Sequence, residues 1–183
     1  MLTPGSLNNA FQIYWDEMHR CTAGKAYWAL LHVTVCLPDI CAALESKNGK
    51  TEGSRYVAWC DKYLIDPALS GSERWQMRCK VLHEGRASIA ASHRYDGFSF
   101  AQPAPKGQVD HMRLVGKTLI LDVGVLAAEM KAGVERWIQY LESNPSAPNA
   151  LHAMANLSSL VQVRQFPHPA STRLVPIIIN RSS

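Results

Sequence analysis

Residues 70–85 read SGSERWQMRCKVLHEG, and they specify a helix at both of its ends. Ser70 and Glu73 have the spacing of a capping box, in which each side chain bonds the backbone N–H of the other at a helix N-terminus. Gly85 is the residue type that most often takes the left-handed conformation just after a helix. The stretch therefore predicts one short helix with defined limits, and the rest of the chain is interpreted around it.

This helix carries an arginine and a histidine five positions apart, Arg78 and His83. Arginine presents a permanent charge in a planar fork that suits phosphate, and histidine titrates near neutral pH. The two form a minimal set for phosphodiester chemistry, in which one holds the anion and the other transfers a proton. On an α-helix they lie about 140° apart and about 7.5 Å along the axis. A long arginine side chain could bridge that gap, but we expect a second copy of the helix facing the first to gather the groups more easily; on spacing alone, ordinary surface residues are the alternative.

Apolar residues recur with helical spacing on the N-terminal side of this stretch. Residues 5–20 and 54–64 each have one apolar stripe, whereas residues 25–46 are apolar nearly all round, which is typical of a buried central helix. Proline lacks an N–H and restricts the residue before it, so we expect this helix to kink or restart at Pro38. Asp39 would then serve the first turn of the restarted helix.

The C-terminal side of the stretch changes character. Residues 98–100 and 112–122 are rich in β-forming side chains and predict a hairpin within a segment of about 95–122. Residues 123–142 return to a helical pattern, with apolar side chains along one side. The order of these elements predicts a mostly α fold with a small β-hairpin insertion.

Two regions are expected from this organisation. Residues 1–143 form a helical domain that includes the hairpin, and residues 144–183 form a partly ordered C-terminal extension. Within the extension, residues 151–160 fit a last helix, while 161–166 and 174–179 fit either short strands or a tail that seeks a partner surface.

Bulk composition fits one ordinary globular domain. The chain has 183 residues, 47% of them hydrophobic and 19% charged, so a sizeable core is available. The net charge of +4 is compatible with nucleic acid but far short of a polycationic binder. Four tryptophans lie in apolar helical patterns and are expected in the core: Trp28, Trp59, Trp75 and Trp137.

The cysteines and the apolar runs predict a cytoplasmic protein. Five cysteines occur without a Cys-x-x-Cys pair, which is the usage of a reducing compartment. The first residues lack the basic start and apolar run of a secretory signal. The longest apolar run, residues 26–37, is shorter than the roughly 20 residues of a membrane span. We therefore expect no association with a membrane.

The run from Arg78 to Gly85 resembles the signature of the HEPN superfamily (higher eukaryotes and prokaryotes nucleotide-binding). That signature is an arginine, four to six residues and a histidine near the end of a late helix in a helical bundle. The segments LPDIC at 37–41 and YVAWCDKYL at 56–64 are similar to those of uncharacterised bacterial proteins with the same helix. In these proteins a hairpin and another helix follow, as here. The resemblance covers residues 22–142 and implies a HEPN-like helical bundle.

Many members of this superfamily are metal-independent ribonucleases of toxin–antitoxin, CRISPR and phage-defence systems, and typically act as dimers. The resemblance implies that Arg78 holds the scissile phosphate and that His83 acts as general acid or base while the ribose 2′-hydroxyl attacks. Arg74, Lys80 and Arg86 are expected to add a positive surface for RNA phosphates. The implied partners are RNA or a nucleotide, a second copy of the chain, and an antitoxin or nucleotidyltransferase protein.

Cys79 marks a departure from the family pattern, because active members usually have a polar residue directly after the arginine. A second interpretation therefore stays open: a non-catalytic HEPN-like module that binds a nucleotide, RNA or a partner protein through the same helix. A third is an unrelated helical structural protein without a site.

No metal or other cofactor is expected from the sequence. A hairpin would bring together four potential ligands, His93, Asp96, Asp110 and His111. The seven histidines show no zinc-like spacing, however, so these side chains are interpreted as surface loop residues.

Overall fold

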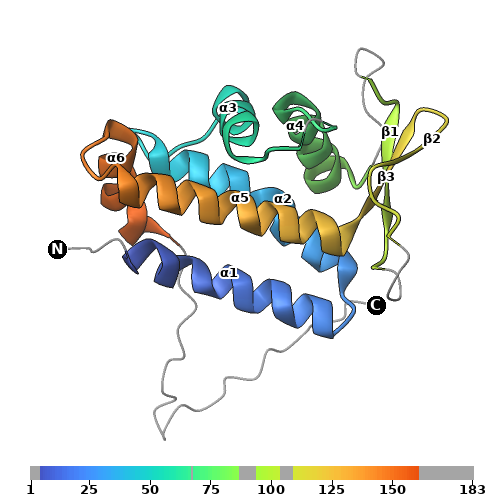
Figure 1. The fold of residues 1–183 in the computed structure, drawn as a ribbon, viewed down its shortest axis with the longest axis horizontal. Helices are drawn as coiled ribbons and strands as arrows, with labels where there is room; N and C mark the ends of the chain where they lie inside the picture. Colours follow the sequence, from blue (N-terminus) through green and yellow to red (C-terminus); the bar gives the residue numbers. More distant parts are fainter. Residues whose placement is uncertain (1–4, 67, 87–93, 104–108, 161–183) are drawn as a thin grey trace, which may run out of the picture.

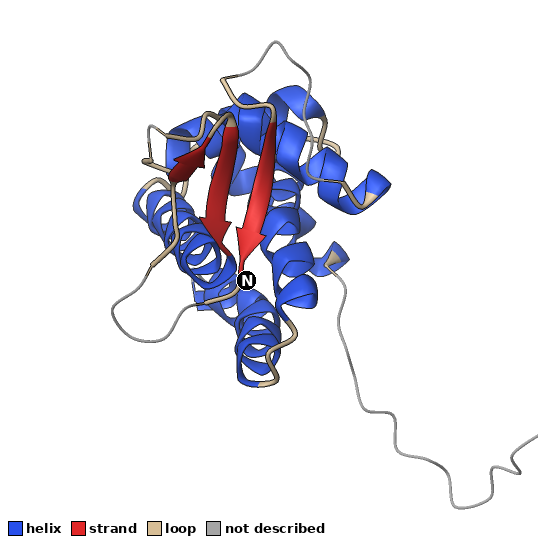
Figure 2. Ribbon diagram, turned by 90° about the vertical axis from the view of Figure 1, so that its right-hand side faces the viewer, coloured by secondary structure: helices blue, strands red, loops and turns tan. Residues whose placement is uncertain are grey.

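The computed structural model describes residues 5–66, 68–86, 94–103 and 109–160. Six α-helices make up most of this described part, and a small three-stranded sheet lies at one end of the helical bundle (Figures 1 and 2). The helices are α1 (Gly5–Ala23), α2 (Tyr27–Glu45), α3 (Gly53–Tyr63), α4 (Gly71–Cys79), α5 (Val123–Ser143) and α6 (Pro148–Asn156). The strands are β1 (Gly97–Ala101), β2 (Arg113–Val115) and β3 (Thr118–Asp122), and two short turns are η1 (Lys80–Glu84) and η2 (Leu157–Ser159). The predicted mostly α fold class is confirmed.

Helix α2 is the central helix, as predicted. It packs against α1, α3, α4, α5 and α6, and its buried side chains include Leu30, Leu31, Val35 and Leu37. Among the described helices, α2 is the one long and apolar enough to cross a membrane, with a mean hydropathy of 1.5. Half of that segment is buried inside the fold, which fits the core helix of a largely soluble protein.

Of the two outcomes predicted at Pro38, a kink or a restart, the restart is wrong. The helix runs unbroken from Tyr27 to Glu45, with Pro38 buried inside it. A proline in a helix interior removes one backbone hydrogen bond and crowds the carbonyl four residues earlier. Here the helices that surround α2 hold it in place, so tertiary packing outweighs the local preference. Asp39 consequently lies in the middle of a helix rather than at a new N-terminus.

Three of the four tryptophans expected in the core pack there. Trp59 and Trp137 are buried, and Trp75 is partly buried against the core. Trp28 is 57% exposed, so its prediction is wrong. It lies in the first turn of α2, where its ring meets that of His32 at 4.5 Å between centroids. Residues four apart share a helix face, and the face that carries these two rings points toward solvent.

The sheet differs from the predicted hairpin. Strand β1 pairs in parallel with β3, and β2 pairs with β3 in the antiparallel direction, so the order is β1-β3-β2. Gly116, with φ of 60°, forms a turn with Lys117 that divides the strand predicted at 112–122. The hairpin is therefore β2–β3, and the strand predicted at 98–100 joins β3 from the other side. A two-residue loop is the shortest common hairpin connection, and Gly favours the positive φ that it requires.

The predicted helix begins and stops where expected, but α4 forms only its first part and a π-turn forms the rest. Ser70 Oγ accepts from the N–H of Glu73, and Glu73 Oε2 accepts from the N–H of Ser70, which completes the capping box. Gly85 has φ of 60° and ends the segment in the left-handed conformation. Between Lys80 and Glu84, however, the chain forms a π-turn in place of α-helix, and the N–H of Gly85 bonds to the carbonyl of Lys80.

Part of the predicted C-terminal extension belongs to the bundle. Helix α6 packs against α2, and Asn156 Nδ2 donates to the carbonyls of Leu44 and Ser46, where α2 ends. These bonds satisfy carbonyls that a helix end leaves without partners. The strands considered at 161–166 and 174–179 lie outside the described residues.

Candidate functional site

Arg78, near the end of α4, and His83, in the π-turn that follows, are in contact within one chain. Arg78 Nη1 lies 2.8 Å from His83 Nε2, which is a hydrogen-bond distance. The separation of about 140° applies to a regular α-helix, and the π-turn at Lys80–Glu84 departs from that geometry. A π-turn has i→i+5 hydrogen bonds, so residues five apart lie on the same face. A second copy of the chain is not needed to gather these two groups.

The contact also defines the proton arrangement of His83. Arginine offers only donors, so His83 Nε2 must accept this bond. The bond therefore requires the tautomer of His83 that carries its hydrogen on Nδ1. The side chain of His83 is exposed, whereas that of Arg78 is only 18% exposed and lies beneath it.

Asp39 of α2 is the third member of the site, and sequence reasoning assigned it only a capping role. Arg78 Nε donates to Asp39 Oδ2 at 2.6 Å, and the aspartate side chain is 13% exposed. Burial raises the pKa of Asp39 above its ordinary value, and the bond from Arg78 offsets only part of that effect. Burial opposes the charge on Arg78, but hydrogen bonding and attraction by Asp39 outweigh it and raise its pKa. The one available signal in the sequence was a carboxylate in an otherwise apolar helix.

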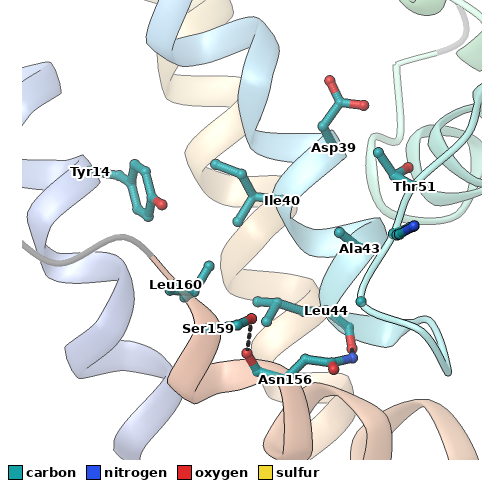
Figure 3. A pocket seen from close by; sticks show the side chains of 11 residues that line it. Tyr14, Asp39, Ile40, Ala43, Leu44, Thr51, Asn156, Ser159 and Leu160 are labelled. Atoms are coloured by element: carbon teal, nitrogen blue, oxygen red, sulfur yellow. Dashed lines mark hydrogen bonds between the residues drawn. The ribbon is translucent and has the colours of Figure 1, made fainter.

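Asp39 also lies at the edge of a pocket. Its volume is about 610 Å³, and it lies where α1, α2 and the C-terminal turn meet (Figure 3). Asp39 is at one edge, Tyr14 faces across from α1, and Leu160 lies near Tyr14. Asp39 Oδ1 is buried and has no hydrogen-bond partner within the described part of the chain. The site thus has an exposed histidine, a shielded arginine and a carboxylate with one unsatisfied oxygen.

The aromatic ring of Trp75 completes the surroundings of Arg78. The guanidinium carbon lies 5.1 Å from the centroid of that ring, within the range of a cation–π contact. Trp75 is held in turn by Tyr56, whose ring centroid is 5.2 Å away and which is fully buried. Arg78 is therefore positioned from three directions, by Asp39, His83 and Trp75.

The three other basic residues predicted to contact RNA differ in their exposure and in their partners. Arg74 is 1% exposed and donates from Nε to the carbonyl of Leu69, so the expectation that it adds to the positive surface is wrong. The helix turns this residue toward α3, and spacing alone did not distinguish the two faces. Lys80 pairs with Glu84 at 2.7 Å. Arg86 is largely exposed and lies 4.0 Å from the same glutamate.

Comparison of the chain with protein-family models, with curated proteins and with solved structures found no match.

Proposed function

We propose that this protein is a HEPN-type, metal-independent endoribonuclease that acts as a homodimer in a toxin–antitoxin or phage-defence role. The observation that carries the proposal is the 2.8 Å contact between Arg78 and His83, with Asp39 behind the arginine. Phosphate recognition favours an arginine whose fork is already oriented, because less freedom is lost when the anion binds. The five free cysteines support the cytoplasmic setting that the proposal includes.

The proposed reaction uses the neutral ring of His83 as a base. The bonds to Asp39 and His83 occupy two of the five N–H groups of Arg78, so three donors remain for phosphate oxygens. As the phosphate draws Arg78 toward it, His83 Nε2 becomes free to accept the proton of the ribose 2′-hydroxyl. The 2′-oxygen then bonds to phosphorus, and the bond from phosphorus to the 5′-oxygen breaks. The leaving 5′-oxygen takes a proton from water, His83 returns its proton to the solvent, and the products are a 2′,3′-cyclic phosphate and a 5′-hydroxyl end.

The test is RNA cleavage by purified protein with and without a chelator, followed by analysis of the new ends. We expect cleavage that survives the chelator at temperatures well below unfolding and leaves cyclic phosphate ends. His83→Ala should reduce the rate by about 10² or more, the usual contribution of a proton-transferring side chain. His19→Ala is the matched control, because this histidine is exposed on α1 and shares no contact with the site. Equal rates for the two variants, or no cleavage by the unaltered protein, would overturn the proposal.

A second candidate function, a non-catalytic binding module, is favoured by the shielding of Arg78. Its side chain is mostly buried and bound to Asp39, and Cys79 follows it where active HEPN proteins usually have a polar residue. In that case the exposed surface around His83 would bind RNA, a nucleotide, an antitoxin or a nucleotidyltransferase. Sedimentation and RNA-binding measurements on Arg78→Ala distinguish the two functions. Altered mass or affinity without any cleavage by the unaltered protein would favour the binding module.

A further inference from the structure

Three potential metal ligands converge at the junction between the sheet and the helical bundle. Asp66 follows α3, His111 precedes β2, and Glu129 lies on α5. One nitrogen of the histidine and one oxygen from each carboxylate all lie within 4.8 Å of one another. These residues are distant in the sequence and share no member with the Arg78–His83 site. Their convergence is produced by the fold.

All three residues of this cluster are partly buried, and the histidine side chain is the more shielded of the His111–Glu129 pair. The side chain of His111 is 8% exposed, and its Nε2 lies 3.1 Å from Glu129 Oε1. His111 Nδ1 and Glu129 Oε2 are both buried and have no hydrogen-bond partner within the described part of the chain. Buried polar atoms are nearly always paired, so two orphans on adjacent side chains require an explanation. A cation held by the Glu129 carboxylate would supply a partner for Oε2.

The third ligand is already oriented. Asp66 Oδ1 accepts from the N–H of Ala68 at 2.7 Å, which fixes the carboxylate on its own loop. Two other side chains that the sequence suggested as ligands are engaged elsewhere: Asp110 accepts from Arg113 at 2.7 Å, and Asp96 lies 4.0 Å from Lys117. His93 lies outside the described residues. Of the four residues first considered, His111 is the one that the structure places in a cluster.

We propose that Asp66, His111 and Glu129 bind a divalent transition-metal ion, for which zinc is the probe. An imidazole nitrogen with two carboxylate oxygens is a ligand set that suits zinc and its neighbours, whereas magnesium and calcium prefer oxygen ligands throughout. Three protein ligands leave the fourth tetrahedral position to water. His111 Nε2 and Glu129 Oε1 lie at a hydrogen-bond distance of 3.1 Å, and an ion bound between them would replace that contact.

The ion has a structural role in this proposal. It joins the loop after α3, the segment that leads into β2, and the middle of α5, and so ties the sheet to the helices. A ligand that binds only the folded chain raises its stability with concentration, so zinc is expected to raise the unfolding temperature. The ion lies apart from the Arg78–His83 contact, so RNA cleavage and metal binding are independent properties.

The experiment is a zinc titration of the full chain, freed of metal beforehand, in competition with a fluorescent chelator. The unaltered protein should bind one equivalent and unfold at a higher temperature in zinc. Asp66→Asn and Glu129→Gln keep the side-chain shapes, and each should weaken binding at least ~10-fold. His111→Ala should do the same, and circular dichroism checks that each variant is folded. His19→Ala is the control and should bind as the unaltered protein does.

The free cysteines are the competing source of zinc binding, and cobalt distinguishes them from the proposed ligands. Cobalt held by nitrogen and oxygen shows weak visible bands without the strong near-ultraviolet band of a thiolate ligand. A thiolate band, or affinity unchanged in Asp66→Asn and Glu129→Gln, would overturn the proposal. Failure of the unaltered protein to bind zinc or to gain thermal stability would do so as well.

Discussion

Replacing Asp39 by alanine would leave the guanidinium of Arg78 shielded from water without its carboxylate. The two side chains are 13% and 18% exposed, so the pair is mostly buried. Removal of one partner from a buried ion pair typically costs about 3–5 kcal/mol. Arg78 keeps its bond to His83 and some contact with water, so we expect Asp39→Ala to lower the free energy of unfolding by about 2–3 kcal/mol.

The coupling free energy between Asp39 and Arg78 tests the ion pair more directly than the loss of stability in either single variant. Arg78→Met leaves Asp39 buried with neither oxygen bonded, since Oδ1 already lacks a partner in the described chain, and should cost a similar amount. The double variant Asp39→Ala/Arg78→Met leaves no unpaired charge. Its loss should therefore fall short of the sum of the two single losses by about 1.5 kcal/mol or more.

Urea unfolding provides the assay, followed by tryptophan fluorescence and by far-ultraviolet circular dichroism. Buried Trp59 and Trp137 report on the core, and unchanged m-values would show that stability alone has changed. Glu135→Gln is the matched control, since its pair with Lys131 is exposed on α5 and should contribute about 0.5 kcal/mol or less. Single losses that add to within ~0.5 kcal/mol would refute the reasoning that Asp39 holds Arg78 in place.

Three further predictions concern the neighbouring structure. Ser70→Ala removes the helix cap and should lower the free energy of unfolding by about 1 kcal/mol in the same urea assay; an unchanged midpoint would contradict the capping role. Gly71→Ala should cost about 1–3 kcal/mol, because a Cβ there would overlap the backbone carbonyl oxygen of Val57, and a neutral effect would show that α3 and α4 separate easily. Burial raises the pKa of Cys60 from 9.0 to about 12, so its thiol stays protonated at pH 8 and should resist a thiolate-selective reagent until urea unfolds the chain. Mass spectrometry locates the modified cysteine, and rapid labelling of Cys60 in the folded protein would contradict this.

Because the pKa of Cys60 differs between the folded and the unfolded chain, its contribution to stability depends on pH. The thiol of Cys60 ionises near 9.0 in the unfolded chain and near 12 in the folded one, so between these values the folded state binds more protons. Its contribution to the free energy of unfolding is therefore fully present below about pH 9 and is lost as the pH rises toward 12.

Features that depend on nearby residues were predictable from the sequence. The capping box at Ser70 and the stop at Gly85 each involve residues within one or two turns, and both are present. The central position of α2 followed from its composition, because a helix that is apolar nearly all round is stable only when surrounded. Local patterns thus defined most of the helices.

Features that depend on distant residues were not predictable. Asp39 meets Arg78 across 39 positions, and nothing in either segment specifies that contact. The parallel pairing of β1 with β3 likewise depends on how the chain between them crosses the sheet. The π-turn was not predictable for another reason. Its hydrogen bonds join residues five apart in place of four, and no residue type in the sequence indicates that difference.

The π-turn also changes what sequence spacing means at this site. Residues five apart share a face in a π-turn, whereas in an α-helix those four apart do. A chain that lacked one residue between Arg78 and His83, and was α-helical there, would bring the same two side chains together. A sequence search that allows only one spacing between the arginine and the histidine would separate the two kinds of chain, although the contact between the side chains is the same. The hydrogen-bond register of the turn defines the site, and the number of intervening residues follows from it.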